Sequence, residues 1–233
     1  MGGFFPAPDF AAKKRSQTGA FSCSINSVKT AILKNKTCVF LTLALLALFV
    51  WSAVNPHSRG VWYVESATAL VPFAAFAWLS RRFEFSTAAY AVFCFWEALQ
   101  IVGAHYSFEL VPFGFFTELV GAERNHFDRL AHFAVGLNAL AVAEYLLGKG
   151  IVNSAKSAAV FSVIAIMAMA NLWELVEWAY AEIDGGDVGA AFLGSQGDIW
   201  DAQKDMLADT LGAVCAASGF ALSRGRGGSP ILA

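Results

Sequence analysis

The sequence contains six apolar runs, each about as long as a helix must be to cross a membrane. About 20 residues at a rise of 1.5 Å per residue span a hydrocarbon core of about 30 Å. Hydrophobic residues make up 57% of the 233 positions and charged residues only 15%, which exceeds the apolar share of an ordinary water-soluble domain. We therefore expect an all-α, polytopic membrane protein with about six transmembrane helices. The predicted spans are residues 37–54, 62–79, 86–104, 128–147, 158–180 and 205–222.

The lysines and arginines predict how these spans are oriented, because cytoplasmic loops carry an excess of basic residues. With the N-terminus in the cytoplasm, 12 of the 16 basic residues fall on the cytoplasmic side and 4 outside. This predicts that both termini are cytoplasmic. The predicted organisation is a flexible basic tail (1–36), a transmembrane domain (37–223) and a short cytoplasmic tail (224–233). The N-terminal tail contains serines and only one acid, so a targeting peptide is an alternative interpretation.

Charge, cysteines and motifs argue against several classes of function. The net charge is -2, and the basic residues form no aromatic-interleaved face, so we expect no nucleic-acid partner. The four cysteines lack CxxC spacing, which predicts neither a disulfide framework nor a thiolate metal site. The sequence has no GxSxG, P-loop, HExxH or CxxCH motif. The lipid bilayer is the partner that the sequence predicts directly, while protein partners stay unknown.

Ionisable residues gather in four stretches at the ends of the predicted spans, namely residues 97–105, 124–132, 174–177 and 194–209. Ionisable groups at membrane depth are costly and by default mark a function. With the predicted orientation, all four stretches lie at the outer level of the membrane. Helical spacing places Asp128 beside His132 and Glu174 beside Glu177. The carboxylates of Asp198, Asp201, Asp205 and Asp209 would line one stripe if the first two are already helical.

Four ordered strings between the spans carry a family resemblance: GAHYSFELVPFGFF, ERNHFDRLAHF, ELVEW and FLGSQGDIWDAQKDM. They resemble the YjdF-like family of predicted multi-pass inner-membrane proteins from the first span to the last. The chain departs from the family pattern at Phe127, where tyrosine is expected, and at residues 134–137, where a Gln-Gly pair is usual. Asp209 has no secure counterpart. The resemblance implies a bacterial inner-membrane location and about six helices, and it implies no particular activity.

The residue types in these stretches predict a divalent-metal site. Carboxylates and imidazoles without thiolates suit Zn²⁺, Mn²⁺ or Fe²⁺. Such an ion would activate water against a lipid-linked ester or phosphate, with Arg124 or Arg129 holding an anionic group and Glu177 or Asp198 acting as general base. The candidate ligands are His126, Asp128, His132, Glu174, Asp201 and Asp205. Further candidate site residues, with no assigned role, are Glu97, His105, Tyr106, Gln196 and Gln203.

The same residues also have structural interpretations. Asp198 and Asp201 are suitable caps for the last helix, the two arginines are suited to ion pairs with Asp128 and its neighbours, and His132 suits a hydrogen bond between helices. Three classes of function stay open: a metal-dependent enzyme on a lipid-linked or phosphorylated substrate, a proton- or ion-coupled carrier, and a non-catalytic membrane or assembly factor. A carrier is less favoured, because among the intramembrane acids only Glu144 lies deep toward the cytoplasmic side.

Overall fold

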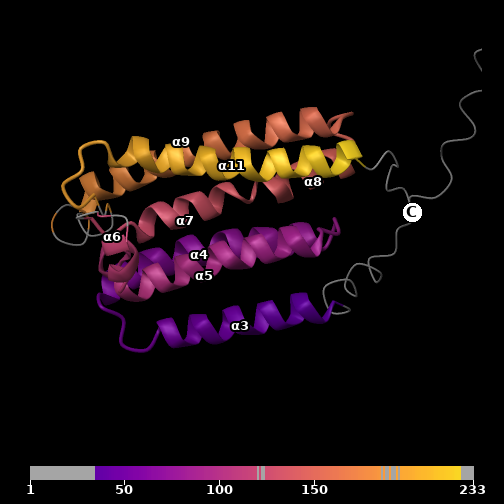
Figure 1. The fold of residues 1–233 in the computed structure, drawn as a ribbon. Helices are drawn as coiled ribbons and strands as arrows, with labels where there is room; N and C mark the ends of the chain where they lie inside the picture. Colours follow the sequence, from indigo (N-terminus) through magenta and orange to yellow (C-terminus); the bar gives the residue numbers. More distant parts are fainter. Residues whose placement is uncertain are drawn as a thin grey trace, which may run out of the picture.

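A computed structural model describes residues 35–119, 121, 124–184, 186, 189, 193 and 195–226. Nearly all of the predicted N-terminal tail and the end of the C-terminal tail lie outside the described residues. Every regular element within them is a helix, which confirms the all-α fold class. The long helices lie side by side, and the chain runs back and forth between two ends of the bundle (Figure 1). The elements are α3 (Lys36–Ser52), α4 (Arg59–Ser80), α5 (Thr87–Tyr106), η1 (Phe108–Leu110), α6 (Gly114–Leu119), α7 (Phe127–Gly136), α8 (Ala139–Gly148), α9 (Ala155–Asp184) and α11 (Asp201–Arg226).

Five segments of the described chain are long and apolar enough to cross a membrane. They are Arg59–Ser80, Thr87–Tyr106, Phe127–Gly148, Ala155–Ile183 and Asp201–Arg224. The first predicted span corresponds to α3, which has 17 residues and therefore lies at the lower limit for crossing a bilayer. The protein is thus a multi-pass membrane protein. That α3 is an additional span, and that both termini are cytoplasmic, stay predictions.

Short polar side chains cap the N-termini of the first three long helices. Asn35 Oδ1 accepts a hydrogen bond from the Thr37 amide at 3.0 Å, and Ser86 Oγ accepts one from the Ala89 amide at 3.1 Å. Ser58 caps α4 in the same way. These oxygens satisfy amides that have no partner within the helix, which an apolar surrounding would otherwise penalise.

The helices form two groups that meet along α5. In the first group, α3 and α4 pack against α5; in the second, α11 packs against α7, α8 and α9. Helix α5 joins the groups through its contacts with α7 and α8. Stacked aromatic rings hold the first group, with Phe76 and Phe93 centroids 4.1 Å apart. Small residues, among them Ala139 and Ala213, fill the core of the second.

Two glycines allow α7 and α11 to touch backbone to backbone. A Cβ on Gly136 would overlap the carbonyl oxygen of Asp209, and a Cβ on Gly212 would overlap the carbonyl oxygen of Phe133. Small residues of this kind permit the closest helix approach in membranes. The contact fixes the register of the two helices and thereby places Asp209 beside His132.

The fourth predicted span, residues 128–147, is interrupted in the middle. Helix α7 ends at Gly136, and α8 begins at Ala139 after a turn at Leu137 and Asn138. The Asn138 backbone N–H donates to the Val135 carbonyl at 2.9 Å and its side-chain Nδ2 to the same oxygen at 3.1 Å, so the side chain adds a second bond at the end of α7. Broken helices are tolerated at membrane depth where such partners replace the lost backbone bonds.

Candidate functional site

Three of the four ionisable stretches meet at one end of the bundle. The start of α7, the end of α9 and the start of α11 lie together at the left end in Figure 1. Helix α11 begins at Asp201, and Asp198 precedes it, where its Oδ1 accepts from the Trp200 amide at 3.1 Å. The carboxylate stripe on α11 therefore has three members, Asp201, Asp205 and Asp209, because Asp198 is not helical.

Two arginines and the α11 carboxylates form a partly buried ion-pair network. Asp201 Oδ1 lies 2.5 Å from Arg124 Nη1 and 2.5 Å from Arg129 Nη2. Arg129 also pairs with Asp205, and both arginine side chains are nearly buried. Breaking such a pair leaves an uncompensated charge, so these contacts fix how α7 docks against α11. This geometry agrees with the structural interpretation of the arginines, and their role in holding a substrate anion stays a prediction.

His132 lies at the centre of three carboxylates. Its Nδ1 is 3.0 Å from Asp209 Oδ2, while its Nε2 is 3.7 Å from Asp128 Oδ1 and 3.8 Å from Asp205 Oδ1. The ligand atoms of Asp128, His132 and Asp205, here called the triad, all lie within 4.8 Å of one another. One imidazole and two carboxylates are a donor set that Zn²⁺, Mn²⁺ and Fe²⁺ accept. The structure thus brings together three of the six predicted metal ligands.

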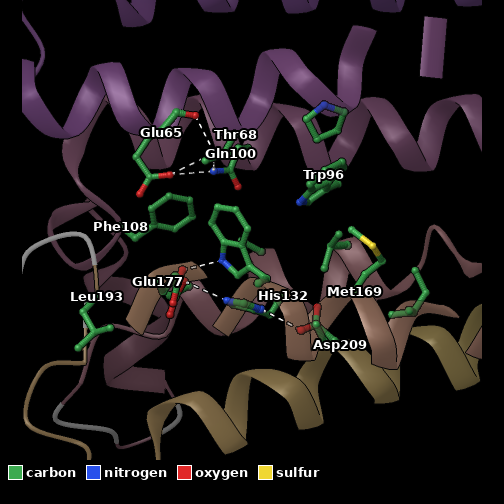
Figure 2. A pocket seen from close by; sticks show the side chains of 17 residues that line it. Glu65, Thr68, Trp96, Gln100, Phe108, His132, Met169, Glu177, Leu193 and Asp209 are labelled. Carbon is green, nitrogen blue, oxygen red and sulfur yellow. Dashed lines mark hydrogen bonds and ion pairs between the residues drawn. The ribbon is translucent and has the colours of Figure 1, made fainter. Parts of the chain in front are cut away.

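Two members of the triad, Asp128 and His132, line a cavity of about 160 Å³, here called the central cavity. Figure 2 shows Glu65, Gln100 and Glu177 at one part of it, with Trp96 and Met169 at another. Polar side chains predominate toward the first part and apolar ones toward the second, where Asp209 is the exception (Figure 2). The lining residues are Glu65, Thr68, Pro72, Trp96, Gln100, Phe108, Asp128, Ala131, His132, Val135, Ile166, Met169, Ala170, Trp173, Glu177, Leu193 and Asp209.

Hydrogen bonds hold two further carboxylates at the cavity wall. Trp173 Nε1 donates to Glu177 Oε1 at 2.6 Å. Gln100 Nε2 donates to Glu65 Oε2 at 2.9 Å and also to Thr68 Oγ1 at 2.6 Å. Glu65, Thr68 and Gln100 were not among the residues predicted from the sequence. The available signal was a polar residue inside an otherwise apolar predicted span, which marks an intramembrane site by default.

Reciprocal bonds tie the loops that precede α7 and α11. The backbone N–H of Asn125 donates to Gln196 Oε1 at 3.0 Å, and Gln196 Nε2 donates to the backbone carbonyl of Asn125 at 3.1 Å. Asn125 Nδ2 also donates to the Val111 carbonyl at 2.7 Å. Gln196 therefore positions the two loops and does not line the cavity.

Two ionisable groups in these loops have shifted pKa values. A hydrogen bond from the Lys204 ammonium group, at 2.6 Å, holds the pKa of Asp198 below its usual value of 3.8. Burial, together with the positive charges of Arg124, Arg129 and Lys204, lowers the pKa of His126 below 6.5. His126 directly precedes α7 and is not part of the triad.

The remaining predicted residues lie apart from the triad. Glu97 is buried in α5, and its Oε1 has no hydrogen-bond partner among the described residues. His105 Nδ1 is 3.0 Å from the Ser52 carbonyl, and its ring packs on Trp51 and Tyr106. Gln203 is exposed. Of the first ionisable stretch, residues 97–105, only Gln100 reaches the central cavity.

Glu174 lies on α9 near the end that carries the triad. Its Oε1 is buried and has no hydrogen-bond partner in the part of the chain that the structure describes. It does not line the central cavity. Its role as a metal ligand stays a prediction.

The fold and the site together define a polytopic α-helical membrane protein with a carboxylate–histidine cluster between its spans. The chain matches, over residues 37–226, the family model described as "Predicted membrane protein (DUF2238)". It belongs to this family, which the sequence strings had predicted under the name YjdF-like. It is also similar to the "Inner membrane protein YjdF" of Escherichia coli (strain K12), with 30% identity over 174 residues that cover 74% of this chain and 83% of the relative.

Among solved structures, none matches the chain significantly. The family, the relative's name and the five apolar spans agree on one location. The chain is a multi-pass inner-membrane protein.

Proposed function

We propose that the protein is a metal-dependent membrane enzyme that acts on a lipid-linked ester, with a divalent ion held by Asp128, His132 and Asp205. The observation that carries the proposal is the convergence of these three side chains within 4.8 Å, two of which, Asp128 and His132, line a cavity with polar and apolar parts. A Zn²⁺, Mn²⁺ or Fe²⁺ ion, when bound, would lower the pKa of a water molecule and polarise a carbonyl group.

The hydrogen bond between His132 and Asp209 suits His132 to this role. A carboxylate that accepts from one imidazole nitrogen fixes the tautomer and leaves the other nitrogen as a ligand. Here Asp209 faces Nδ1 at 3.0 Å, so Nε2 is the nitrogen directed at Asp128 and Asp205. The proposed ligand atom is therefore Nε2.

Glu177 is the proposed general base. It lines the central cavity and is not part of the triad, and Trp173 holds it in place. Asp198, the other predicted base, is bound to Lys204 and does not line the cavity. The ester is preferred over a phosphate because Arg124 and Arg129 are engaged by Asp201 and neither lines the cavity.

A proton-coupled carrier is the second candidate, and Glu97 is the observation that favours it. This acid is 2% exposed, and the partner its Oε1 lacks among the described residues is what a transferable proton would supply. The Glu97→Gln variant separates the two candidates: a carrier would lose proton flux into proteoliposomes, whereas metal content would not change.

The metal content of protein purified in nanodiscs, measured by elemental analysis, tests the enzyme proposal. Wild-type protein incubated with Zn²⁺, Mn²⁺ or Fe²⁺ and then dialysed should retain one of them stoichiometrically. Asp128→Asn and His132→Gln should lose it, whereas Gln203→Ala, an exposed position on α11, should keep it. Glu174→Gln tests whether the ligand set is wider. A substoichiometric metal content in wild type, or an unchanged metal content in His132→Gln, would contradict the proposal.

Arg129 provides a second test of the same site. Its guanidinium pairs with Asp205 Oδ1, the same oxygen that faces His132, so it competes with a metal for this ligand. Arg129→Gln should therefore raise metal affinity. Arg124→Gln is the comparison variant and should raise it less, because Arg124 reaches the triad only through Asp128, at 3.7 Å, and has no ion pair with Asp205 among the described residues. A metal affinity no higher in Arg129→Gln than in Arg124→Gln would contradict this competition.

A further inference from the structure

The lining of the central cavity changes from polar to apolar in the same direction on three helices. Along α9 it passes from Glu177 and Trp173 to Met169 and Ile166, a distance of about 16 Å at 1.5 Å per residue. Two other helices repeat the order, with Glu65 and Thr68 before Pro72 on α4 and Gln100 before Trp96 on α5. Figure 2 shows Trp96 and Met169 on the side of the cavity away from Leu193. The polar part is therefore nearer the α9–α11 connection, and the apolar part lies deeper in the bundle.

The cavity is also open to the side of the bundle. Helix α4 packs against α5, and α9 packs against α8 and α11, with no extensive packing between α4 and α9 among the described residues. Met169 lines the cavity and is nevertheless 61% exposed, so it stands at an opening. Exposed apolar residues on the two helices include Val71 on α4 and Leu172 on α9, which are suited to contact with lipid.

The volume of the cavity limits what can enter. About 160 Å³ is close to the size of an engineered cavity of about 150 Å³ that binds benzene, and well below the roughly 300 Å³ of the smallest ordinary ligand pockets. A whole lipid does not fit. The cavity itself holds a small polar end, and the atoms that follow leave through the opening beside Met169 into the bilayer.

We propose that the substrate is a lipid whose polar end enters the central cavity sideways from the bilayer, between α4 and α9, while its chain leaves past Met169. This rests on the proposed function and names its substrate class. The lipid belongs to the leaflet nearer the α9–α11 connection, which is the outer leaflet in the predicted orientation. Three carboxylates line the polar part, those of Glu65, Asp128 and Glu177, so a polar end without net negative charge is preferred.

Photolabelling in nanodiscs tests the entry route. The probe is phosphatidylethanolamine with a diazirine on the first carbons of one acyl chain, and labelled residues are mapped by mass spectrometry. Ile166 lines the cavity and is 7% exposed, so a lipid reaches it from inside the cavity and not from the outer surface of the helix. We expect labelling of Ile166 in addition to lipid-facing residues such as Val160 and Leu172. Phosphatidylglycerol with the same diazirine should label Ile166 several-fold less.

Two variants control the experiment. Met169→Trp adds bulk at the opening and should strongly reduce labelling of Ile166, while Leu172→Trp, an exposed position on the same helix that does not line the cavity, should not. Labels confined to Val160 and Leu172, or an unaffected Ile166 in Met169→Trp, would overturn lateral entry; equal labelling by phosphatidylglycerol would overturn the charge preference. Labelling should persist in His132→Gln, so loss of the metal site and loss of lipid entry are distinguishable.

Discussion

His132 Nδ1 and Asp209 Oδ2 lie 3.0 Å apart across the contact between α7 and α11, although 77 residues separate them in the chain. Asp209 is 1% exposed, so the pair is shielded from solvent on the Asp209 side. The sequence predicted Asp209 as part of a row of carboxylates on the last helix, but it assigned this residue no role. Its position behind the imidazole makes it a positioning residue for the proposed ligand.

The Asp209→Asn variant tests this relationship. An asparagine keeps the shape of the side chain but no longer offers a charged acceptor to the imidazole, so the ring loses basicity and orientation. We expect metal affinity to fall about 10- to 100-fold, the usual effect of losing such a partner, as measured by competition with a fluorescent chelator. Thr210→Val, at the next and partly buried position on α11, serves as control. Unchanged affinity in Asp209→Asn would remove Asp209 from the site.

The glycine contact between α7 and α11 predicts that alanine substitutions at two glycines of α11 change the stability of the protein to different extents. Gly212→Ala places a methyl group against the Phe133 carbonyl, whereas Gly219→Ala meets no atom within 4 Å. Overpacking of this kind costs about 1–3 kcal/mol, so Gly212→Ala should lower the thermal unfolding temperature in detergent. Gly219→Ala should leave it unchanged or raise it slightly, because alanine favours helix. Equal unfolding temperatures for the two variants would contradict the close approach.

His126, in the loop before α7, predicts that the stability of the folded protein depends on pH. The pKa of His126 is lowered in the folded protein, so the unfolded chain binds more protons as pH falls through about 6.5. The contribution of His126 to stability is therefore lost as pH falls through 6.5 toward the lower folded value. Titration of ¹⁵N-labelled His126 by NMR should give a midpoint below 6.5 that rises in Lys204→Met and stays fixed in Gln203→Met. A midpoint at or above 6.5 in wild type would contradict the prediction.

The predicted orientation has a direct test. In a cysteine-free background, Phe115→Cys in α6 and Asn153→Cys in the α8–α9 connection are both exposed positions at opposite ends of the bundle. A membrane-impermeant maleimide added to intact cells should label position 115, and it should label position 153 only after the inner membrane is permeabilised. The reverse pattern would place the C-terminal end of α11 outside and the site on the cytoplasmic side.

The positions of the long helices and the meeting of three ionisable stretches followed from apolar length and the alternation of spans. These features depend on local hydrophobicity and on connectivity, which a single sequence carries. The break at Asn138 did not follow, because the surrounding residues 128–147 are apolar enough for one span. At the break both the backbone and the side chain of Asn138 donate to the Val135 carbonyl, a local arrangement that apolar length does not reveal.

The partners within the site were less predictable than its location. Arg129 was suited equally to a substrate anion and to an acid of a neighbouring helix, and the choice depends on the rotation of α11 about its axis. Glu65 and Gln100 contact each other across α4 and α5, a pairing that no spacing within either segment reveals. Tertiary packing, and not helical periodicity, decides both cases.

The ion pairs between α7 and α11 have a consequence for how the protein is inserted into the membrane during synthesis. Helix α11 follows α7 in the chain and leaves the ribosome after it, yet it supplies Asp201, Asp205 and Asp209. Until α11 inserts, Arg129 and His132 have Asp128 on their own helix but lack their carboxylate partners on α11. A chain that stops before α11 therefore leaves Arg129 and His132 incompletely paired near membrane depth, which is costly, so α7 reaches its stable position only once α11 has inserted beside it.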